Sequence, residues 1–258
     1  MSNFDIADRH ILITGASSGF GHHFAGVLAA AGAKVSLGAR RTEKLKDRVD
    51  ELTAAGGTAQ AVALDVTKPA SVDQFFTDAE AAFGPAQILI NNAGVESGAK
   101  TYAMIDEDDW DYVLDTNLKG AWRCSKRFTE SIAANKTPNG NIVMVSSITD
   151  RRTLKGQFPY AVSKAAMTRM TEVMALEAAR YGIRVNALAP GYILTDVSRI
   201  LLESDAAPGF MKGIPLRRFG EFDDLDGPLM LLVSDASAYM TGSVLTVDGG
   251  HVCAALPS

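Results

Sequence analysis

The sequence has little cysteine, few aromatic residues and no long hydrophobic run. Its two cysteines, Cys124 and Cys253, are too few for a disulfide framework or a thiolate metal site. No apolar stretch reaches the ~18 residues that a membrane-spanning helix needs. The polar, partly acidic start of the chain does not resemble a signal peptide. We therefore expect a cytoplasmic protein that has no membrane partner.

Acidic residues outnumber basic ones, 30 to 25. The formal net charge is −5 at pH 7, which argues against a general affinity for nucleic acid. The rest of the composition, 47% hydrophobic and 21% charged, is that of an ordinary globular protein. With no linker, internal repeat or low-complexity tract in 258 residues, the sequence predicts one domain spanning residues 1–258.

Short apolar runs alternate along the chain with longer amphipathic ones. The short runs predict strands covered on both faces, at 11–14, 34–38, 59–64, 88–91, 141–146, 183–188 and 244–247. The longer runs predict helices over 21–31, 42–54, 70–83, 108–134, 160–180 and 223–234. Gly32 and Gly182 suit helix ends, and Pro69 suits a helix start. This order predicts an α/β Rossmann-type doubly wound sandwich of three layers, with about seven parallel strands and helices on both faces.

Three glycines, Gly15, Gly19 and Gly21, lie between the first predicted strand and the first predicted helix. At this place glycines let backbone N–H groups approach a pyrophosphate at a helix N-terminus. A tight turn without a ligand is the alternative. The position directly after the first strand favours a bound dinucleotide.

The end of the second predicted strand indicates which dinucleotide binds. An NAD-binding protein usually has an acid here that accepts a hydrogen bond from the ribose. This chain has Arg40 and Arg41 instead, and guanidinium groups can hold a 2′-phosphate. At ~1.5–3 kcal/mol for a charged hydrogen bond, the preference for NADP(H) over NAD(H) would be about tenfold to a hundredfold. The alternative is that both arginines begin a solvated helix.

Tyr160, Lys164 and Ser147 form the predicted reaction centre. Tyr160 and Lys164 are one helical turn apart and share a face, and Ser147 ends a strand thirteen positions before Tyr160. A phenol with a pKa near 10 is a poor base at neutral pH. We expect the ammonium and the positive nicotinamide ring to lower that pKa. Tyr160 would then donate a proton to a carbonyl oxygen in reduction and accept it in oxidation, while Ser147 holds that oxygen.

From about Arg9 to Gly250 the chain resembles the short-chain dehydrogenase/reductase family. Besides the glycine turn and the Ser-Tyr-Lys set, the resemblance depends on Asp65-Val66, Asn91-Asn92-Ala93-Gly94, Asn117-x-x-Gly120, Pro190-Gly191 with Thr195, Thr241-Gly242 and Asp248-Gly249-Gly250. It implies a homo-oligomer, a homotetramer or dimer, formed through the helices at 108–134 and 160–180. It also implies that Asn117 completes the catalytic set by holding a water that connects Lys164 to solvent.

The resemblance further implies the cofactor contacts. Asp65 and Val66 would flank the adenine, and Ile193 with Thr195 would hold the carboxamide. Ser18 stands where NADP-binding relatives often have a basic residue, so the phosphate preference depends on Arg40, with Arg41 as a second candidate. The full expected set is Gly15, Ser17, Ser18, Gly19, Phe20, Gly21, Arg40, Arg41, Asp65, Val66, Asn92, Ala93, Gly94, Tyr160, Lys164, Pro190, Gly191, Ile193 and Thr195.

The substrate is indicated only by an irregular, apolar segment at 192–220. Such a long loop is usually functional, and here it predicts a lid over a hydrophobic pocket. Expected substrate contacts are Ser147, Leu154, Phe158, Tyr160 and Tyr192. The predicted activity is that of a carbonyl reductase or alcohol dehydrogenase acting on a hydrophobic small molecule. Alternatively, the apolar side chains pack the lid onto the body or form a subunit contact.

Two other functions stay open. The substrate would be a carrier-bound 3-oxoacyl thioester if Arg123, Lys126, Arg127 and Arg169 meet an acidic carrier protein, although they suit solvated helix charges equally. The other alternative function is that of a cofactor-sensing protein without catalysis, which the complete catalytic set disfavours.

We expect no metal site, because His22-His23 has no partner at metal-ligand spacing and His10 and His251 look peripheral.

Overall fold

The computed structural model describes residues 3–195 and 207–254 of the chain. Its centre is a seven-stranded parallel sheet in the order β3-β2-β1-β4-β5-β6-β7. The strands are β1 His10–Thr14, β2 Lys34–Ala39, β3 Thr58–Ala63, β4 Ile88–Asn91, β5 Gly140–Val145, β6 Ile183–Pro190 and β7 Val244–Val247. This confirms the predicted parallel sheet and its strand number.

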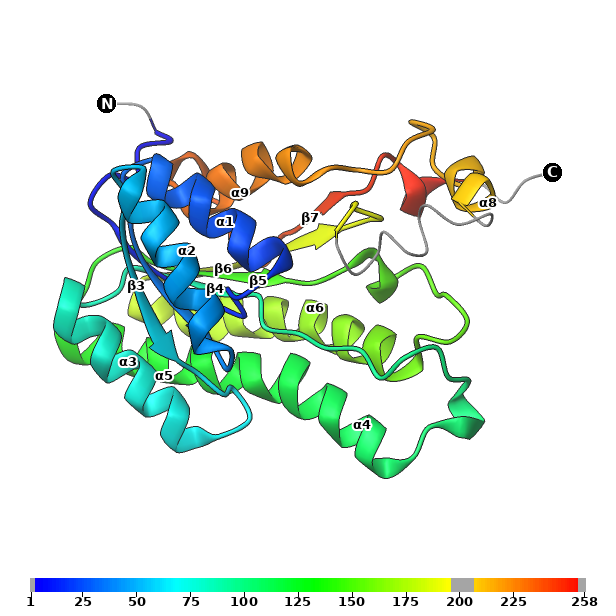
Figure 1. Ribbon diagram of the computed structural model, residues 1–258, viewed down its shortest axis with the longest axis horizontal. Coiled ribbons are helices and arrows are strands. Elements are labelled where there is room, and N and C mark those ends of the chain that lie inside the picture. The colour runs from blue at the N-terminus through cyan, green and yellow to red at the C-terminus, as the bar shows by residue number, and fades with distance from the viewer. Residues whose placement is uncertain (1–2, 196–206, 255–258) are drawn as a thin grey trace.

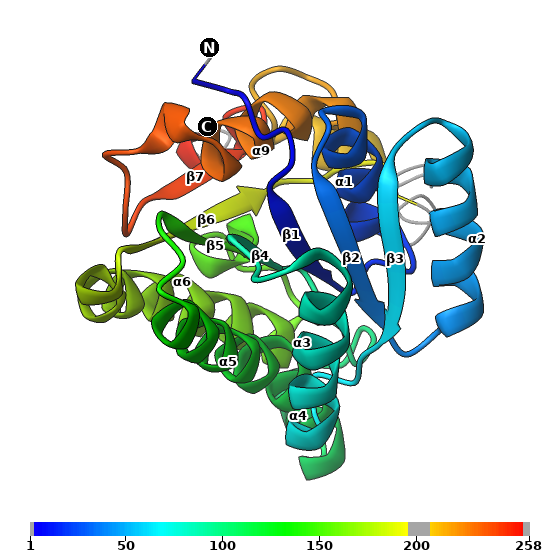
Figure 2. The same ribbon diagram turned by 90° about the vertical axis from the view of Figure 1, so that its left-hand side faces the viewer.

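Helices cover both faces of the sheet, as Figures 1 and 2 show. One face carries α1 Gly19–Ala30, α2 Thr42–Ala54 and α9 Asp226–Val233, and the other carries α3 Pro69–Phe83, α4 Glu107–Leu114, α5 Gly120–Asn135 and α6 Phe158–Ala178. A short helix, α8 Ala207–Lys212, lies near the C-terminal part of the chain. The described helices include none that is long and apolar enough to cross a membrane.

Each face has its own hydrophobic core because side chains alternate along a strand. In β1, Ile11 and Ile13 pack with the α1 side chains Phe24 and Leu28, whereas Leu12 packs on the opposite side. The central strands are fully buried, which explains their near-continuous apolar sequences.

The strand order reverses beside β1, where β4 pairs on the side opposite β2. In doubly wound sheets, ligands bind beyond the carboxyl ends of the strands at this switch point. The glycine turn after β1 and the Asn92-Ala93-Gly94 segment after β4 both lie here.

The predicted helix 108–134 is present but contains an irregularity that was not predicted. Its two α-helical parts, α4 and α5, are joined by a π-helical turn at Asp115–Lys119. The turn directs Asn117 into the protein, where it is fully buried. Such insertions are frequent at functional sites, and the apolar period of the sequence does not reveal them. The other predicted helices and strands are confirmed to within three residues at each end.

The predicted lid at 192–220 is described at its two ends, and its middle, 196–206, lies outside the described residues. The ends are joined by hydrogen bonds from the Leu194 N–H to the Gly220 carbonyl (2.8 Å) and from the Gly220 N–H to the Tyr192 carbonyl (2.9 Å). Ile214 and Phe219 form a small cluster of their own. The described apolar residues of this segment therefore pack largely against one another.

Candidate active site

The glycine turn packs tightly against the segment that follows β4. Gly15 has φ +69°, and a Cβ there would lie 2.7 Å from the Cα of Ala93. A Cβ at Gly21 would lie 2.7 Å from the carbonyl oxygen of Gly15. The Asn92 side-chain amide donates to the carbonyls of Thr14 (3.0 Å) and Gly15 (3.1 Å). Only glycine fits these two positions, which leaves the backbone at the start of α1 open to a ligand.

Arg41 is anchored beside this turn. Its guanidinium donates to the hydroxyls of Ser17 (2.9 and 3.1 Å) and Ser18 (2.6 Å). Arg40 is exposed and acts electrostatically on Asp65. Both guanidiniums therefore lie at the carboxyl ends of β2 and β3. This is where the sequence predicts that the 2′-phosphate of NADP(H) binds. The sequence favours Arg40 over Arg41 as the phosphate-binding residue and gives no sign of the two serines that bind Arg41.

Asp65 and Val66 follow β3. Burial would raise the pKa of Asp65, but hydrogen bonds from Thr67 and the charge of Arg40 bring it below its usual range. Val66 is buried, and a Cβ at Gly120 would lie 2.6 Å from its Cγ2. The start of α5 is thus held against the segment expected to flank the adenine.

Ser147, Tyr160 and Lys164 come together at the carboxyl end of β5. The Ser147 side chain acts on the Tyr160 hydroxyl and favours its ionised form. Lys164 is 4% exposed, and its Nζ donates to the Val145 carbonyl (2.7 Å) while lying 5.5 Å from the Tyr160 ring centre. The structure therefore brings the three predicted groups into one cluster.

The expectation of a lowered Tyr160 pKa is wrong for the protein by itself. Burial raises the pKa of Tyr160 above its usual range, and the negative charge of Glu96 raises it further. The Ser147 hydrogen bond acts in the opposite direction but is weaker. Lys164 is not among the groups that shift the pKa of Tyr160. A phenolate here would need the positive nicotinamide ring.

Lys164 is itself perturbed, since burial lowers its pKa from 10.5 to about 8 while Glu96 opposes the shift. Between pH 8 and 10.5 the unfolded chain binds a proton on Lys164 that the folded chain has lost, so stability from this group rises with pH. We expect the free energy of unfolding of wild type, relative to Lys164→Met, to increase across this window and to be level below it. Urea titrations at several pH values measure it.

The matched control is Lys46→Met, because Lys46 is 63% exposed. Parallel curves for wild type and Lys164→Met would contradict a lowered Lys164 pKa.

Asn117 is held by three hydrogen bonds. Its Oδ1 accepts from the Val95 N–H (2.7 Å), and its Nδ2 donates to the Val95 carbonyl (3.0 Å) and the Ser163 hydroxyl (3.1 Å). A Cβ at Gly94 would lie 3.5 Å from Asn117 Oδ1 and 3.7 Å from Lys164 Nζ. Asn117 thus fixes the loop after β4 directly beside Lys164.

Glu96 is a site residue that sequence reasoning missed. Although the residue is exposed, it acts electrostatically on both Tyr160 and Lys164, and partial desolvation of its carboxyl raises its own pKa. The sequence feature that could have indicated Glu96 is its position, two residues after the Asn92-Ala93-Gly94 segment.

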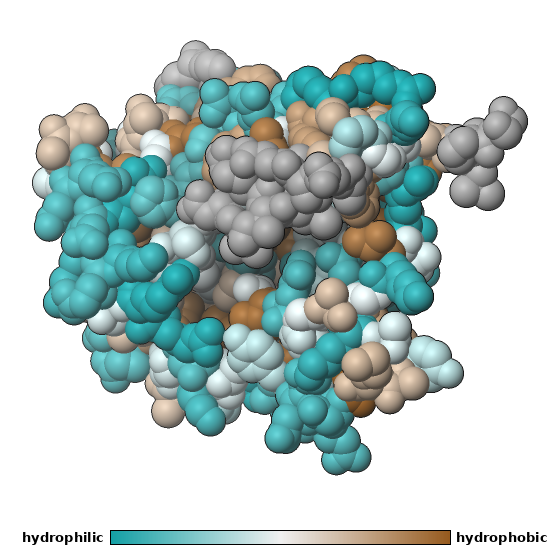
Figure 3. All heavy atoms as spheres, turned by 45° about the vertical axis from the view of Figure 1, so that its right-hand side comes forward, coloured by the Kyte–Doolittle hydropathy of each residue, from teal (hydrophilic) through white to brown (hydrophobic). Residues whose placement is uncertain are grey.

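The predicted substrate residues divide into two groups. Leu154 and Tyr192 line a cavity of about 970 Å³ that adjoins Ile148 and Thr149, next to Ser147 in the chain. Figure 3 shows a hollowed face of the molecule with hydrophilic and hydrophobic side chains mixed around it. Phe158 is 41% exposed and packs on Tyr102 and Trp110, away from the residues that line this cavity.

The end of β6 carries the last cofactor candidates. The Gly191 N–H donates to the Val247 carbonyl (2.9 Å), and a Cβ at Gly191 would lie 2.6 Å from the Cβ of Asp248. Pro190 is in β6, and Ile193 is buried in the core on the α1 side of the sheet. Gly191 therefore lets the strand end approach Asp248.

The histidines are more engaged than the sequence suggests. His23 Nε2 lies 2.6 Å from an Asp226 carboxylate oxygen, and Asp223 brings a second carboxylate to the same cluster. His10 is buried between Gly84 and Ser36, and His251 lines the cavity beside Tyr192. His10 and His251 are therefore not peripheral. Sequence spacing gave no sign of the His23 cluster, because Asp226 is 203 residues away.

The parallel sheet with its order reversal at β1 defines a Rossmann-type α/β protein. A family model described as "Enoyl-(Acyl carrier protein) reductase" matches residues 15–251. The chain is 36% identical over 239 residues to the 3-oxoacyl-[acyl-carrier-protein] reductase FabG of Escherichia coli K12, covering 93% of this chain and 95% of that protein. It is 37% identical over 248 residues to the (2S)-[(R)-hydroxy(phenyl)methyl]succinyl-CoA dehydrogenase subunit BbsD of Thauera aromatica, covering 95% and 97%.

Among solved structures, a gluconate 5-dehydrogenase from Burkholderia cenocepacia J2315 in complex with NADP and tartrate superimposes with a TM-score of 0.92. Its sequence is 32% identical, and the match covers 98% of each chain. The chain therefore belongs to the short-chain dehydrogenase/reductase family, whose members are oxidoreductases that act on hydroxyl or keto groups with a nicotinamide dinucleotide.

Proposed function

We propose that the protein is an NADP(H)-dependent oxidoreductase that interconverts a ketone and a secondary alcohol. The observation that carries this proposal is the grouping of Ser147 and Tyr160 with Lys164, which is buried one helical turn away from Tyr160. In reduction, Tyr160 gives its proton to the carbonyl oxygen that Ser147 holds by a hydrogen bond. The bound dinucleotide supplies the hydride.

The glycine turn and the two arginines would hold the dinucleotide. Gly15 and Gly21 leave room for the pyrophosphate at the start of α1, and Arg40 and Arg41 bring two positive charges to the adenosine ribose. The related gluconate 5-dehydrogenase structure contains NADP, which agrees with this choice. An acid that would repel a 2′-phosphate is absent from residues 35–41, all of them described.

The proton of Tyr160 is replenished through Lys164 and Asn117 in this proposal. Lys164 Nζ and Asn117 Oδ1 both border Gly94, so a single water bridging them would reach the solvent side of the β4 loop. The low pKa of Lys164 suits a group that passes protons at neutral to mildly basic pH.

The substrate would be a small molecule with an apolar body. Leu154 and Tyr192 line the cavity beside Ser147 and support this, as do Ile148 and Phe210. We do not include Phe158, because it packs outside the cavity lining.

A carrier-bound 3-oxoacyl thioester is the second candidate substrate, favoured by the similarity to FabG of E. coli. The cations that would meet a carrier protein are already engaged. Arg123 and Arg127 lie near Asp115 and Asp73, and Lys126 and Arg169 near Glu130 and Glu172. This pairing favours the free small molecule.

We also propose a homo-oligomer formed through α5 and α6. These helices expose large apolar side chains, with Trp122 46%, Val173 45% and Leu176 82% exposed. Exposed apolar groups on adjacent helices are typical of subunit contacts.

The experiment is a panel of ketones, secondary alcohols and 3-oxoacyl thioesters, free and carrier-bound, followed by the absorbance of the reduced cofactor. We expect NADPH oxidation with free ketones at rates above those with the carrier thioester. Faster turnover of the carrier thioester would select the second candidate. A panel without any turnover would contradict the proposed function.

A further inference from the structure

The cavity that adjoins Ile148 and Thr149, the two residues after Ser147, carries positive charge on its wall. Arg152, Lys212 and Arg217 line it, together with His251. The described residues that line it include no aspartate or glutamate. This is unusual in a chain whose formal net charge is −5. A wall with one sign of charge raises the local concentration of ligands of the opposite sign.

Arg152 is the cation best placed to bind such a ligand. Its side chain is partly buried, and its Nη1 donates to the backbone carbonyl of His251 (3.1 Å). Its charge opposes the rise that burial causes in the pKa of Tyr192, and it adds to the fall that burial causes in the pKa of His251. The guanidinium therefore lies between β5 and the C-terminal segment, close to two rings that line the cavity.

The charge of Arg152 has no carboxylate partner within the described part of the chain. Its neighbour Arg151 contacts Asp150, and Arg218 makes a bidentate pair with Asp224. Partial burial of a guanidinium without a counter-charge costs free energy. An anionic ligand in the cavity would recover that cost through charge-assisted hydrogen bonds.

Two buried polar atoms on cavity residues also lack partners. Thr149 Oγ1 and His251 Nδ1 have no hydrogen bond within the described structure, and His251 is only 5% exposed. A buried polar atom without a partner is uncommon in folded proteins. Both atoms belong to groups that can donate to an oxygen acceptor.

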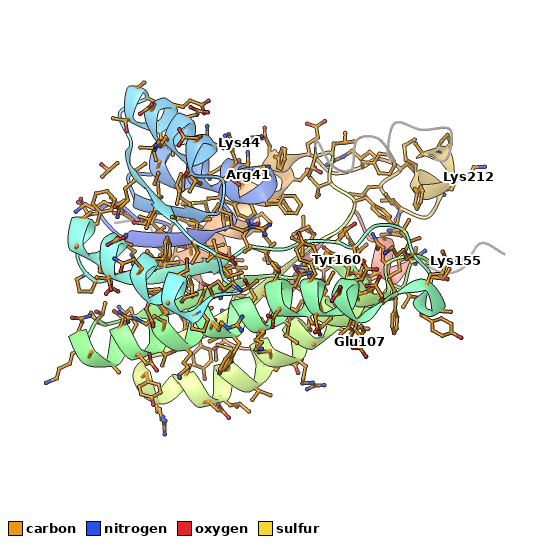
Figure 4. All side chains as sticks on the ribbon, turned by 60° about the horizontal axis from the view of Figure 1, so that its bottom comes forward. Arg41, Lys44, Glu107, Lys155, Tyr160 and Lys212 are labelled. Carbon is orange, nitrogen blue, oxygen red and sulfur yellow. The ribbon has the colours of Figure 1, made fainter. Side chains whose placement is uncertain are left out.

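The remaining cations of the cavity, Lys212 and Arg217, extend its positive charge towards solvent. Lys212 is exposed at the end of α8, and Figure 4 shows Tyr160 between Arg41 on one side and Lys155 and Lys212 on the other. In this view Arg41 and the cavity residue Lys212 thus lie on opposite sides of Tyr160. Glu96, the carboxylate coupled to Tyr160, is not among the described residues that line the cavity.

We propose that the substrate carries an anionic group, a carboxylate or a phosphate ester, that binds Arg152 while its apolar body contacts Leu154 and Tyr192. This inference rests on the proposed function, because it places the anion at the end of a ketone held by Ser147 and Tyr160. It replaces a wholly hydrophobic substrate with an amphiphilic one.

The test compares matched substrates on wild type and Arg152→Gln. One arm uses a series of keto acids, with the carboxylate at increasing distance from the ketone, and their methyl esters. The other uses 3-oxoacyl phosphopantetheine and 3-oxoacyl pantetheine. For wild type we expect the best anionic compound to exceed its neutral partner at least about tenfold in kcat/KM, as a charged hydrogen bond predicts. Arg152→Gln should remove this preference by raising KM, with the neutral partner within about twofold.

Arg152→Lys, which keeps the charge, should retain part of the preference. Arg180→Gln changes net charge equally at an exposed position after α6 and should leave the preference intact. The arm that shows the preference identifies the anion as carboxylate or phosphate. Equal kcat/KM for anionic and neutral partners in both arms, or a preference unchanged in Arg152→Gln, would overturn the inference.

Binding separates this inference from the proposed function. Calorimetric titration of the NADP⁺-loaded protein with the corresponding hydroxy acids and phosphates measures the anion site without turnover. Binding that is lost in Arg152→Gln, in a protein that reduces no ketone, would refute the proposed function and uphold the anion site. Turnover of neutral ketones without any preference for anionic substrates would uphold the proposed function and refute the anion site.

Discussion

Tyr160→Phe is expected to lower kcat about 10²–10⁴-fold, the usual contribution of a positioned general acid or base. The change removes only the hydroxyl that bonds to Ser147, so the Kd for NADPH should stay within about threefold of wild type. Single-turnover rates with a ketone from the panel measure the first quantity. Fluorescence titration of the reduced cofactor measures the second.

Tyr181→Phe is the matched control, because Tyr181 lies just beyond the other end of α6 and is 37% exposed. Its rate should equal that of wild type. A Tyr160→Phe rate within tenfold of wild type would contradict the role of Tyr160 as proton donor. A large loss of NADPH affinity would instead assign Tyr160 to cofactor binding.

The second large effect concerns the choice of dinucleotide. Arg41→Ala removes the guanidinium that Ser17 and Ser18 hold beside the glycine turn. We expect kcat/KM with NADPH to fall about tenfold to a hundredfold through KM, the magnitude of a lost charged hydrogen bond, while the value with NADH changes little. Arg40→Ala should act in the same direction, and the double variant should lose the preference for NADPH.

Lys46→Ala is the control for general loss of charge on α2, since Lys46 is exposed and pairs with Glu43. It should leave the ratio of kcat/KM with NADPH to that with NADH unchanged. A double variant Arg40→Ala/Arg41→Ala with the wild-type ratio would show that neither arginine reads the phosphate.

Much of the fold could be predicted because its signals are local. Alternating apolar runs gave the strands, and the glycines and Pro69 gave helix boundaries. The π-helical turn at Asp115–Lys119 could not be predicted, because it depends on Asn117 bonding to Val95, 22 residues away. The strand order depends on equally distant pairings.

The site was predictable as a set of residues but not in its electrostatics. The Tyr160-Ser147 pair could be expected from spacing, whereas the rise in the pKa of Tyr160 depends on burial and on Glu96. The same holds for Arg152, which is one of five consecutive polar residues, Thr149 to Thr153. Only the three-dimensional structure shows that Arg151 contacts the carboxylate of Asp150, whereas Arg152 contacts no carboxylate among the described residues.

The most direct measurement follows the hydride itself. The protein is incubated with a ketone substrate and NADPH labelled with deuterium at C4, on either face, and the alcohol product is analysed by mass spectrometry and NMR. The account predicts one deuterium on the carbinol carbon from one face only, with the same product formed far more slowly by Tyr160→Phe. An unlabelled alcohol from both cofactors, or bound NADPH that is never oxidised by any ketone, would contradict it.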